Sequence, residues 1–227
     1  MIIDFMKSQP NSTVKQAISI ASALEKVYPE AVCALQYDGQ PWRLMVMARL
    51  SAQCTDARVN QVCAILFDRF PTYEALADAP LAEVEQIIRP CGLFHVKAKE
   101  IIAECALLRD EYNGTVPDTM EELLKFPGVG RKVANLLLGD LYALPGIVVD
   151  THCIRLSGRW GLVPDGEKDP VKIERILSKA LDSLDGQAQS DFCHRIVLFG
   201  REYCSARAPR CGDCPLAHLC PSKQEAL

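Results

Sequence analysis

Apolar positions recur along this chain with the spacing of helices. Between Thr13 and Tyr28 they stand three or four residues apart, which predicts a helix with one buried face. Similar stripes occur at 59–70, 81–88, 98–108, 173–184 and 192–199, while residues 42–50 are almost continuously apolar. Alternation with a period of two, which marks a half-buried strand, is not sustained anywhere. The pattern predicts an all-α fold built from many short helices.

Residues 119–142 predict two helices joined by a tight turn. Thr119 and Glu122 have the spacing of a capping box, which marks the start of the first helix. Pro127 stops that helix, because its ring and its missing N–H cannot continue the hydrogen-bond ladder. We therefore expect a helical hairpin in the middle of the chain.

Two glycines, Gly128 and Gly130, are expected to give this turn the backbone freedom for a sharp reversal. The first turn of the following helix leaves N–H groups unpaired, an arrangement that suits a phosphate. The same stretch holds cations and no acid, namely Lys125, Arg131 and Lys132. An ordinary turn with solvated cations is the alternative interpretation. Lys132 disfavours it, because the helix dipole opposes a positive charge in the first turn.

Asp150 stands at the start of another predicted helix, in the sequence Val149-Asp150-Thr151-His152. Its carboxylate can cap that helix. A lysine and a carboxylate can also carry out chemistry together, since the amine attacks as a nucleophile and the acid accepts a proton or stabilises positive charge.

The composition is that of a soluble globular protein, with 49% apolar and 24% charged residues. No apolar run approaches the length of a membrane span, and we expect a cytoplasmic protein. The net charge is −4, but it is unevenly distributed. Twelve acidic and five basic residues lie between positions 68 and 122, whereas five basic and two acidic residues lie between 194 and 223. A local basic face can therefore bind phosphates despite the acidic total.

Eleven cysteines are present, and an odd number argues against a disulfide framework. Four of them fall close together near the end of the chain, at Cys204, Cys211, Cys214 and Cys220. Four thiolates can hold a zinc ion or a 4Fe–4S cluster, and the donors alone do not choose between the two. Arg207 and Arg210 lie between the first two cysteines, so a bound metal would fix two cations in one loop.

The sequence from Pro127 to Lys132, the sequence from Val149 to His152 and the four terminal cysteines together resemble the endonuclease III family of DNA glycosylases. The resemblance implies a two-lobed helical protein with a DNA cleft, and it favours the 4Fe–4S cluster, in a structural role, over zinc. It also implies a division of the chain into a six-helix barrel domain at 34–144, with a helix-hairpin-helix motif at 119–142, and a discontinuous iron–sulfur domain at 1–33 and 145–227.

By the same resemblance, the protein would remove oxidised pyrimidines from double-stranded DNA. Lys132 would attack C1′ of the damaged nucleotide and displace the base, and β-elimination from the resulting Schiff base would cut the strand at the abasic site. Asp150 would accept a proton or stabilise charge on the sugar. The expected partner is duplex DNA with damaged bases or abasic sites, and the expected state is a monomer, associated with the nucleoid if bacterial.

The resemblance assigns DNA contacts to further residues. Gln53 and Leu93 match the family's inserting residues, which fill the gap when a base leaves the stack. The alternatives are a polar helix end for Gln53 and a core position for Leu93. The remaining predicted contacts are Gly128, Val129, Gly130, Arg131, His152, Arg207 and Arg210. A structural role at the start of its helix is the alternative for His152.

Two hypotheses from different classes follow. The first is a bifunctional glycosylase and lyase, and the second is a non-catalytic helix-hairpin-helix module that binds DNA and carries a structural metal loop. Lys132 and Asp150 together favour the enzyme, because a module that only binds DNA needs neither. A redox sensor would leave the hairpin lysine without a role.

Overall fold

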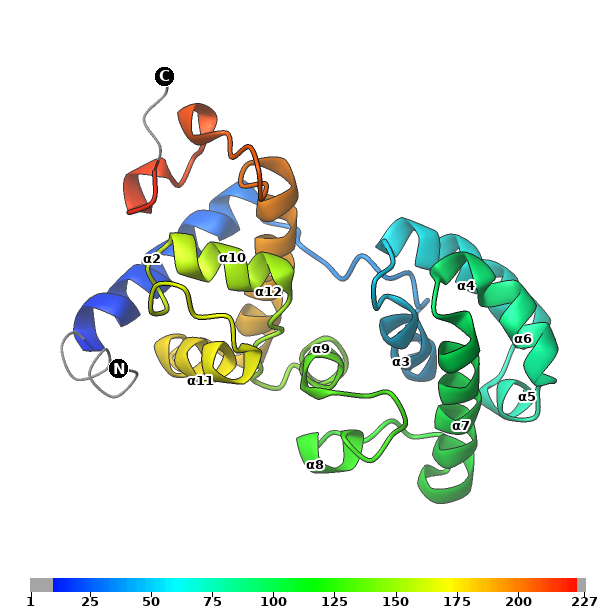
Figure 1. Cartoon of the computed structure of the whole chain (residues 1–227). Helices are drawn as coiled ribbons and strands as arrows, with labels where there is room; N and C mark the ends of the chain where they lie inside the picture. Colours follow the sequence, from blue (N-terminus) through cyan, green and yellow to red (C-terminus); the bar gives the residue numbers. More distant parts are fainter. Residues whose placement is uncertain (1–9, 224–227) are drawn as a thin grey trace. The chain divides into compact units, whose positions relative to one another are not determined.

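The structure is a computed structural model and describes residues 10–223. Every regular element in this range is a helix, so the all-α prediction is confirmed for the described residues. The described chain divides into two compact units, one formed by residues 33–142 and the other by residues 10–32 and 143–223 (Figure 1). The first unit starts at residue 33, where the predicted barrel domain starts at 34, and it ends at residue 142, where the predicted domain ends at 144. Residues 1–9 and 224–227 of the predicted iron–sulfur domain lie outside the described residues.

The unit at 33–142 is built around a mostly apolar helix, α3 (Pro41–Leu50). Its helices are α3 (Pro41–Leu50), α4 (Asp56–Arg69), α5 (Tyr73–Ala77), α6 (Leu81–Ile88), α7 (Phe94–Tyr112), α8 (Met120–Leu123) and α9 (Arg131–Tyr142). Most residues of α3 are buried, as its nearly continuous apolar run predicts. It packs against α4, α7 and α9. Each large apolar side chain buried there contributes about 1.5–3 kcal/mol, so α3 anchors the unit.

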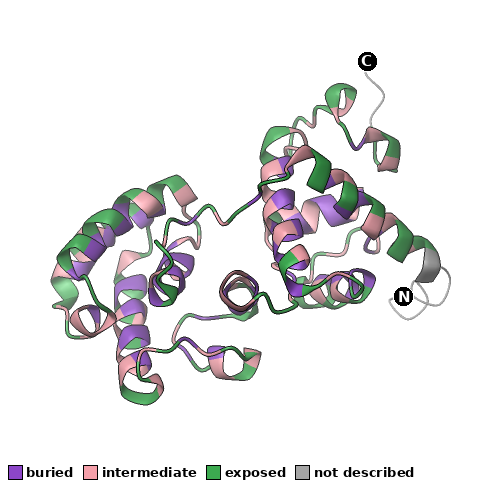
Figure 2. Cartoon of the chain, turned by 180° about the vertical axis from the view of Figure 1, so that it is seen from behind, coloured by how far each residue is buried: buried purple, intermediate pink, exposed green. Residues whose placement is uncertain are grey.

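The second unit joins the start of the described chain to its end. Its helices are α2 (Pro10–Val27), α10 (Thr151–Arg159), α11 (Pro170–Ala180) and α12 (Gly186–Glu202). α12 packs against both α2 and α10. The rings of Trp160 and Phe199, with centroids 5.7 Å apart, lie in its core. Figure 2 shows buried residues along the inward faces of the helices in each unit, which is the amphipathic pattern read from the sequence.

Side chains cap the starts of several helices, including the two predicted at Thr119 and Asp150. The hydroxyl of Thr119 accepts a hydrogen bond from the N–H of Glu122 at 3.3 Å, although the Glu122 carboxylate binds Tyr112 and Lys125 instead of reaching back. Asp169 caps α11 with Pro170 as the first helical residue. The five-residue helix α5 was not predicted, because so short a segment does not display a helical period. Within residues 10–223, no helix is both long and apolar enough to span a membrane.

Candidate active site and cluster loop

The hairpin between α8 and α9 depends on one glycine. Gly128 has φ +77°, a left-handed conformation that glycine adopts without strain. A Cβ atom at Gly128 would collide with the side chain of Arg49, which packs beneath the turn. Gly130 is different, since its φ is not positive and an added Cβ would meet no described atom within 4 Å. The expectation that Gly130 supplies backbone freedom is therefore wrong, because the reversal is completed at Gly128.

An ion pair between Arg49 and Glu100 packs against the hairpin at Gly128. Arg49 of α3 donates to the carboxylate of Glu100 on α7, and both side chains are largely shielded from solvent. Val129 fixes the turn from within the core, since its side chain is buried and its N–H donates to the carbonyl of Phe126 at 3.1 Å. The buried side chain of Val129 therefore shapes the loop, and the DNA contact of Val129 stays a prediction.

The hairpin presents two cations at the start of α9. Arg131 and Lys132 are the first two residues of this helix, and both are exposed. Lys125, on the other side of the turn, is held by Glu122 at 2.6 Å. The local structure therefore places the predicted nucleophile in solvent, in the first turn of a helix whose N–H groups favour phosphate.

Asp150 caps α10 as predicted. Its Oδ1 accepts a hydrogen bond from the N–H of Cys153 at 2.7 Å, and its backbone is extended. His152 lies on the first turn, where its Nδ1 is 3.0 Å from a guanidinium nitrogen of Arg155. Arg155 also donates to the carbonyls of Gly200 and Cys204. These contacts support the structural alternative for His152, because they tie it to the segment that leads into the cysteines.

Gln53 and Leu93 both lie in loops of the 33–142 unit and are exposed. Leu93 is 57% exposed, which excludes a core position. Both residues adopt left-handed backbone conformations, with φ of +55° and +49° respectively. For non-glycine residues this conformation is strained and often marks a functional site.

The four terminal cysteines line a single pocket, whose apolar wall is formed by Trp160, Phe199 and Tyr203. Burial raises the pKa of the Cys214 and Cys220 thiols, so a metal must displace their protons on binding. Four sulfur donors from one short segment, facing one pocket, fit a metal centre with four thiolate ligands.

Arg159, which was not predicted from the sequence, binds the cysteine segment, the stretch from 204 to 220 that contains the four terminal cysteines. Arg159, at the end of α10, has a guanidinium nitrogen 3.1 Å from the Sγ of Cys204. It also donates to the carbonyls of Ser205 and Ala206, at 2.8 and 2.9 Å. Its positive charge would stabilise thiolate ligands. A sequence signal exists, because Arg155 and Arg159 are spaced i, i+4 on a helix that begins beside Asp150.

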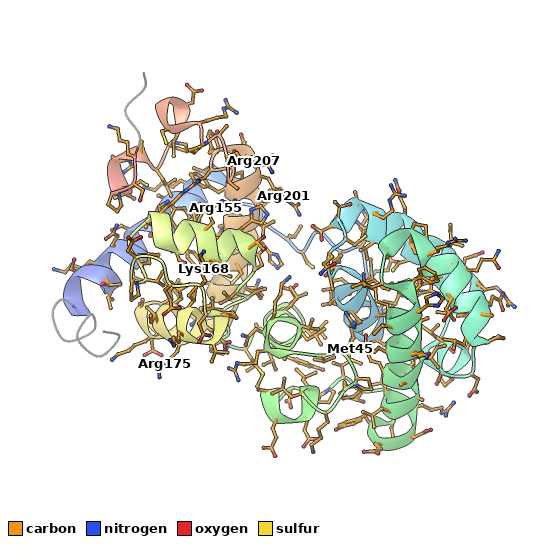
Figure 3. All side chains as sticks on the ribbon, in the orientation of Figure 1. Met45, Arg155, Lys168, Arg175, Arg201 and Arg207 are labelled. Carbon is orange, nitrogen blue, oxygen red and sulfur yellow. The ribbon has the colours of Figure 1, made fainter. Side chains whose placement is uncertain are left out.

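Arg207 and Arg210 are both exposed on the cysteine segment, as predicted. Arg210 lies over the ring of Tyr203, 5.6 Å from its centroid, and is 3.4 Å from the carboxylate of Asp213. In the unit that contains α2, α10, α11 and α12, Figure 3 places Arg207 at the end that carries the four terminal cysteines, away from Arg175 on α11. The two cations between the first ligands therefore remain available at the surface.

Comparison with known proteins is consistent with this geometry. Residues 46–183 match the HhH-GPD superfamily of base excision DNA repair proteins. Residues 204–220, which begin and end on the outer two cysteines, match the iron-sulfur binding domain of endonuclease III. The fold and the site thus define a helix-hairpin-helix DNA repair protein with an iron–sulfur domain.

Individual relatives narrow this class. Endonuclease III of Synechocystis sp. is 46% identical over 94% of this chain and 95% of the relative. A non-covalent endonuclease III–DNA complex and a trapped endonuclease III–DNA covalent intermediate are each 39% identical, with a TM-score of 0.84, covering 92% of this chain and 96% of theirs. The chain belongs to the endonuclease III family. The match over residues 204–220 shows that the chain carries a 4Fe–4S cluster, which confirms the predicted cofactor over zinc.

Proposed function

We propose that this chain removes oxidised pyrimidines from duplex DNA and cuts the abasic site through a Schiff base on Lys132. As a member of the endonuclease III family, it is a DNA glycosylase with abasic-site lyase activity. The observation that carries the assignment of Lys132 is its place as an exposed amine in the first turn of α9, directly after the hairpin. A relative with a similar fold has been trapped as a covalent intermediate with DNA.

The proposed reaction has two stages. The unprotonated Nζ of Lys132 attacks C1′ of the damaged nucleotide, the bond from C1′ to the base breaks, and the base leaves with a proton. The C1′–O4′ bond then breaks, O4′ takes up a proton as the sugar ring opens, and the amine and C1′ are left as a protonated imine, which makes the C2′ proton acidic. Loss of that proton breaks the bond from C3′ to the phosphate oxygen, and the strand is cut on the 3′ side.

Asp150 is proposed to assist the first stage. Its carboxylate can accept the proton of the attacking amine or stabilise the positive charge that develops on the sugar as the base departs. One oxygen caps α10, which fixes the orientation of the carboxylate. A preoriented charge of this kind acts without rearrangement during the reaction.

The cluster is proposed to have a structural role. When bound, it crosslinks residues 204–220 and so fixes the loop that carries Arg207 and Arg210. A rigid loop loses less conformational entropy when its cations bind phosphates. The proposed partner is therefore duplex DNA with a damaged base or an abasic site, bound by a monomer in the compartment that contains the DNA.

A non-catalytic DNA-binding module is the weaker candidate. Such a module would use the hairpin and the cysteine loop but would not need an amine at position 132 or a carboxylate at position 150. The family assignment and these two residues together favour the enzyme.

Borohydride trapping tests the proposal, because borohydride reduces the imine to a stable crosslink. The wild-type protein, incubated with abasic duplex and borohydride, should give a protein–DNA band, and Lys132→Ala should abolish both the band and strand cleavage. Alanine is a good helix former, so α9 should remain folded. Lys125→Ala is the matched control, since Lys125 is an exposed hairpin lysine engaged by Glu122.

A full crosslink with Lys132→Ala would overturn the assignment and direct attention to another amine. The preferred substrate follows from the wild-type rates on duplexes that each carry one lesion. Excision of an oxidised pyrimidine should exceed excision of an undamaged or alkylated base.

A further inference from the structure

A buried lysine joins the two loops that carry Gln53 and Leu93. Lys97 lies on α7 and has no exposed surface. Its Nζ donates to the carbonyl oxygens of Leu50 at 2.9 Å, Ala52 at 2.7 Å and Cys91 at 2.9 Å. The first two acceptors belong to the end of α3 and the turn that follows it, and the third belongs to the last residue of the short 3-10 helix η1 (Arg89–Cys91), just before the loop that carries Leu93.

These three bonds use the full donor capacity of an ammonium group. A buried charge is stable only when it is paired or hydrogen-bonded, so Lys97 and the three carbonyls depend on one another. The interaction also spans a long stretch of sequence. Ala52 lies 45 positions before Lys97, and Leu50 lies 47 positions before it. One side chain therefore sets the distance between two loops that are far apart along the chain.

The backbone near these acceptors is strained in both loops. The carbonyl of Ala52 directly precedes Gln53, and the carbonyl of Cys91 lies two residues before Leu93; Gln53 and Leu93 both have positive φ. Such conformations persist only where the surroundings hold them. The N–H of Lys97 also donates to the carbonyl of Leu93 at 3.0 Å, so the same residue holds this loop at two points.

The two held side chains face solvent. Leu93 is 57% exposed and Gln53 is also exposed. An apolar and a polar side chain, presented by two loops at a fixed spacing, suit a space that is formed only when a nucleotide leaves the stack.

We propose that Lys97 is a positioning residue, which fixes the two loops relative to each other so that Gln53 and Leu93 fill the gap together. This inference rests on the proposed function, in which a damaged base is extruded. It assigns Lys97 no contact with DNA and no chemical step. Its effect is confined to the stage in which the duplex must be opened.

The consequence is a selective defect. Excision of a paired, damaged base requires the loops to stabilise an extruded nucleotide, whereas a preformed abasic site has no base to unstack. Lys97→Met keeps an unbranched side chain of nearly the same length but removes all three donors. It should lower excision by at least about tenfold more than it lowers strand cleavage at a preformed abasic site.

Lys99→Met is the matched control, because Lys99 lies on the same helix and is exposed. It should leave the ratio of excision to abasic cleavage unchanged. Lys97→Arg retains the charge and the donors, so its ratio of excision to abasic cleavage should lie between those of Lys97→Met and the wild type. If Lys97→Met does not fold, the ratio of Lys97→Arg is compared with that of the wild type instead. Equal loss of both activities in the folded variants would overturn the proposal and leave Lys97 a purely structural residue.

A mutant cycle tests whether Lys97 acts through the loops. In a protein that already contains Gln53→Ala and Leu93→Ala, Lys97→Met should have little further effect on excision, because coupled residues are not additive. A full additional loss would contradict the proposal. Amide hydrogen exchange gives a measurement independent of activity, and Lys97→Met should speed exchange at residues 51–54 and 91–94 together.

The two proposals can fail separately. If the wild-type protein neither excises a damaged base nor cuts an abasic site, the proposed function fails whatever the exchange data show. If the wild type is active but Lys97→Met shows no selective loss, or if exchange changes in neither loop, the role of Lys97 fails alone.

Discussion

The carboxylate of Asp150 and the backbone N–H of Cys153 are joined by a hydrogen bond of 2.7 Å at the start of α10. A cap of this kind needs an oxygen acceptor but not a negative charge. The proposed catalytic role, in contrast, needs the charge. The two roles of Asp150 can therefore be separated by a substitution that keeps the oxygen.

Asp150→Asn should leave the protein folded and almost abolish base excision. Asparagine caps helices as well as aspartate does, so the midpoint of thermal unfolding should change little. Loss of one electrostatic catalytic group lowers the rate by roughly 10²–10³-fold, and some cleavage of preformed abasic sites should persist. Asp169→Asn, at the cap of α11, is the control and should retain excision. Wild-type excision rates in Asp150→Asn would remove Asp150 from the reaction.

Cys214→Ser should remove the cluster and weaken DNA binding. The wild-type protein should contain about four irons per chain and absorb visible light, and the variant should lose both properties because one of four thiolate ligands is missing. Binding should weaken because the loop at 204–220 is no longer crosslinked. Cys63→Ala, at a buried cysteine of the other unit, should keep its iron. One zinc and no iron in anaerobically purified wild-type protein would contradict the prediction.

Arg207→Ala should make DNA binding less sensitive to salt. Each phosphate contact releases counterions, so losing one should reduce the slope of log affinity against log salt by about one. Arg210→Ala should have a smaller effect, because Arg210 also engages Asp213 and Tyr203 within the chain. Arg175→Ala on α11 is the control and should not change the slope. Unchanged slopes for both loop arginines would mean that the DNA lies elsewhere.

Glu104→Gln should change how stability depends on pH. Glu104 on α7 is fully buried, and neither carboxylate oxygen has a hydrogen-bond partner within residues 10–223. Burial raises the pKa of Glu104 well above its ordinary value of 4.5. Between the unfolded and the folded pKa the native state binds more protons, so the free energy of unfolding should fall as pH rises.

In Glu104→Gln that fall should be absent, and the variant should gain stability over wild type as the pH rises above 4.5 towards the folded pKa. Denaturant unfolding at a series of pH values measures the difference. Glu111→Gln, at an exposed position of the same helix, should run parallel to wild type. A constant difference between Glu104→Gln and wild type across this range would show that Glu104 does not titrate there.

Much of this protein can be predicted from short stretches of sequence. Apolar stripes predict the longer helices, and capping residues such as Asp150 and Asp169 mark where helices start. Spacing brings the four terminal cysteines together as ligands. These signals are local: a helical period, a cap or a short ligand segment involves residues that are neighbours in the chain.

Other features were decided only by tertiary packing. The sequence did not distinguish Gly128, which packs over Arg49, from Gly130, which an added Cβ would not crowd. The sequence did not decide whether the side chain of Leu93 lies in the core or at the surface, and it indicated no role for Lys97. Lys97 and Leu50 are 47 positions apart in sequence, and Lys97 binds the carbonyl of Leu50 because α7 packs against α3. Contacts of this kind depend on where whole helices lie, so no local pattern contains them.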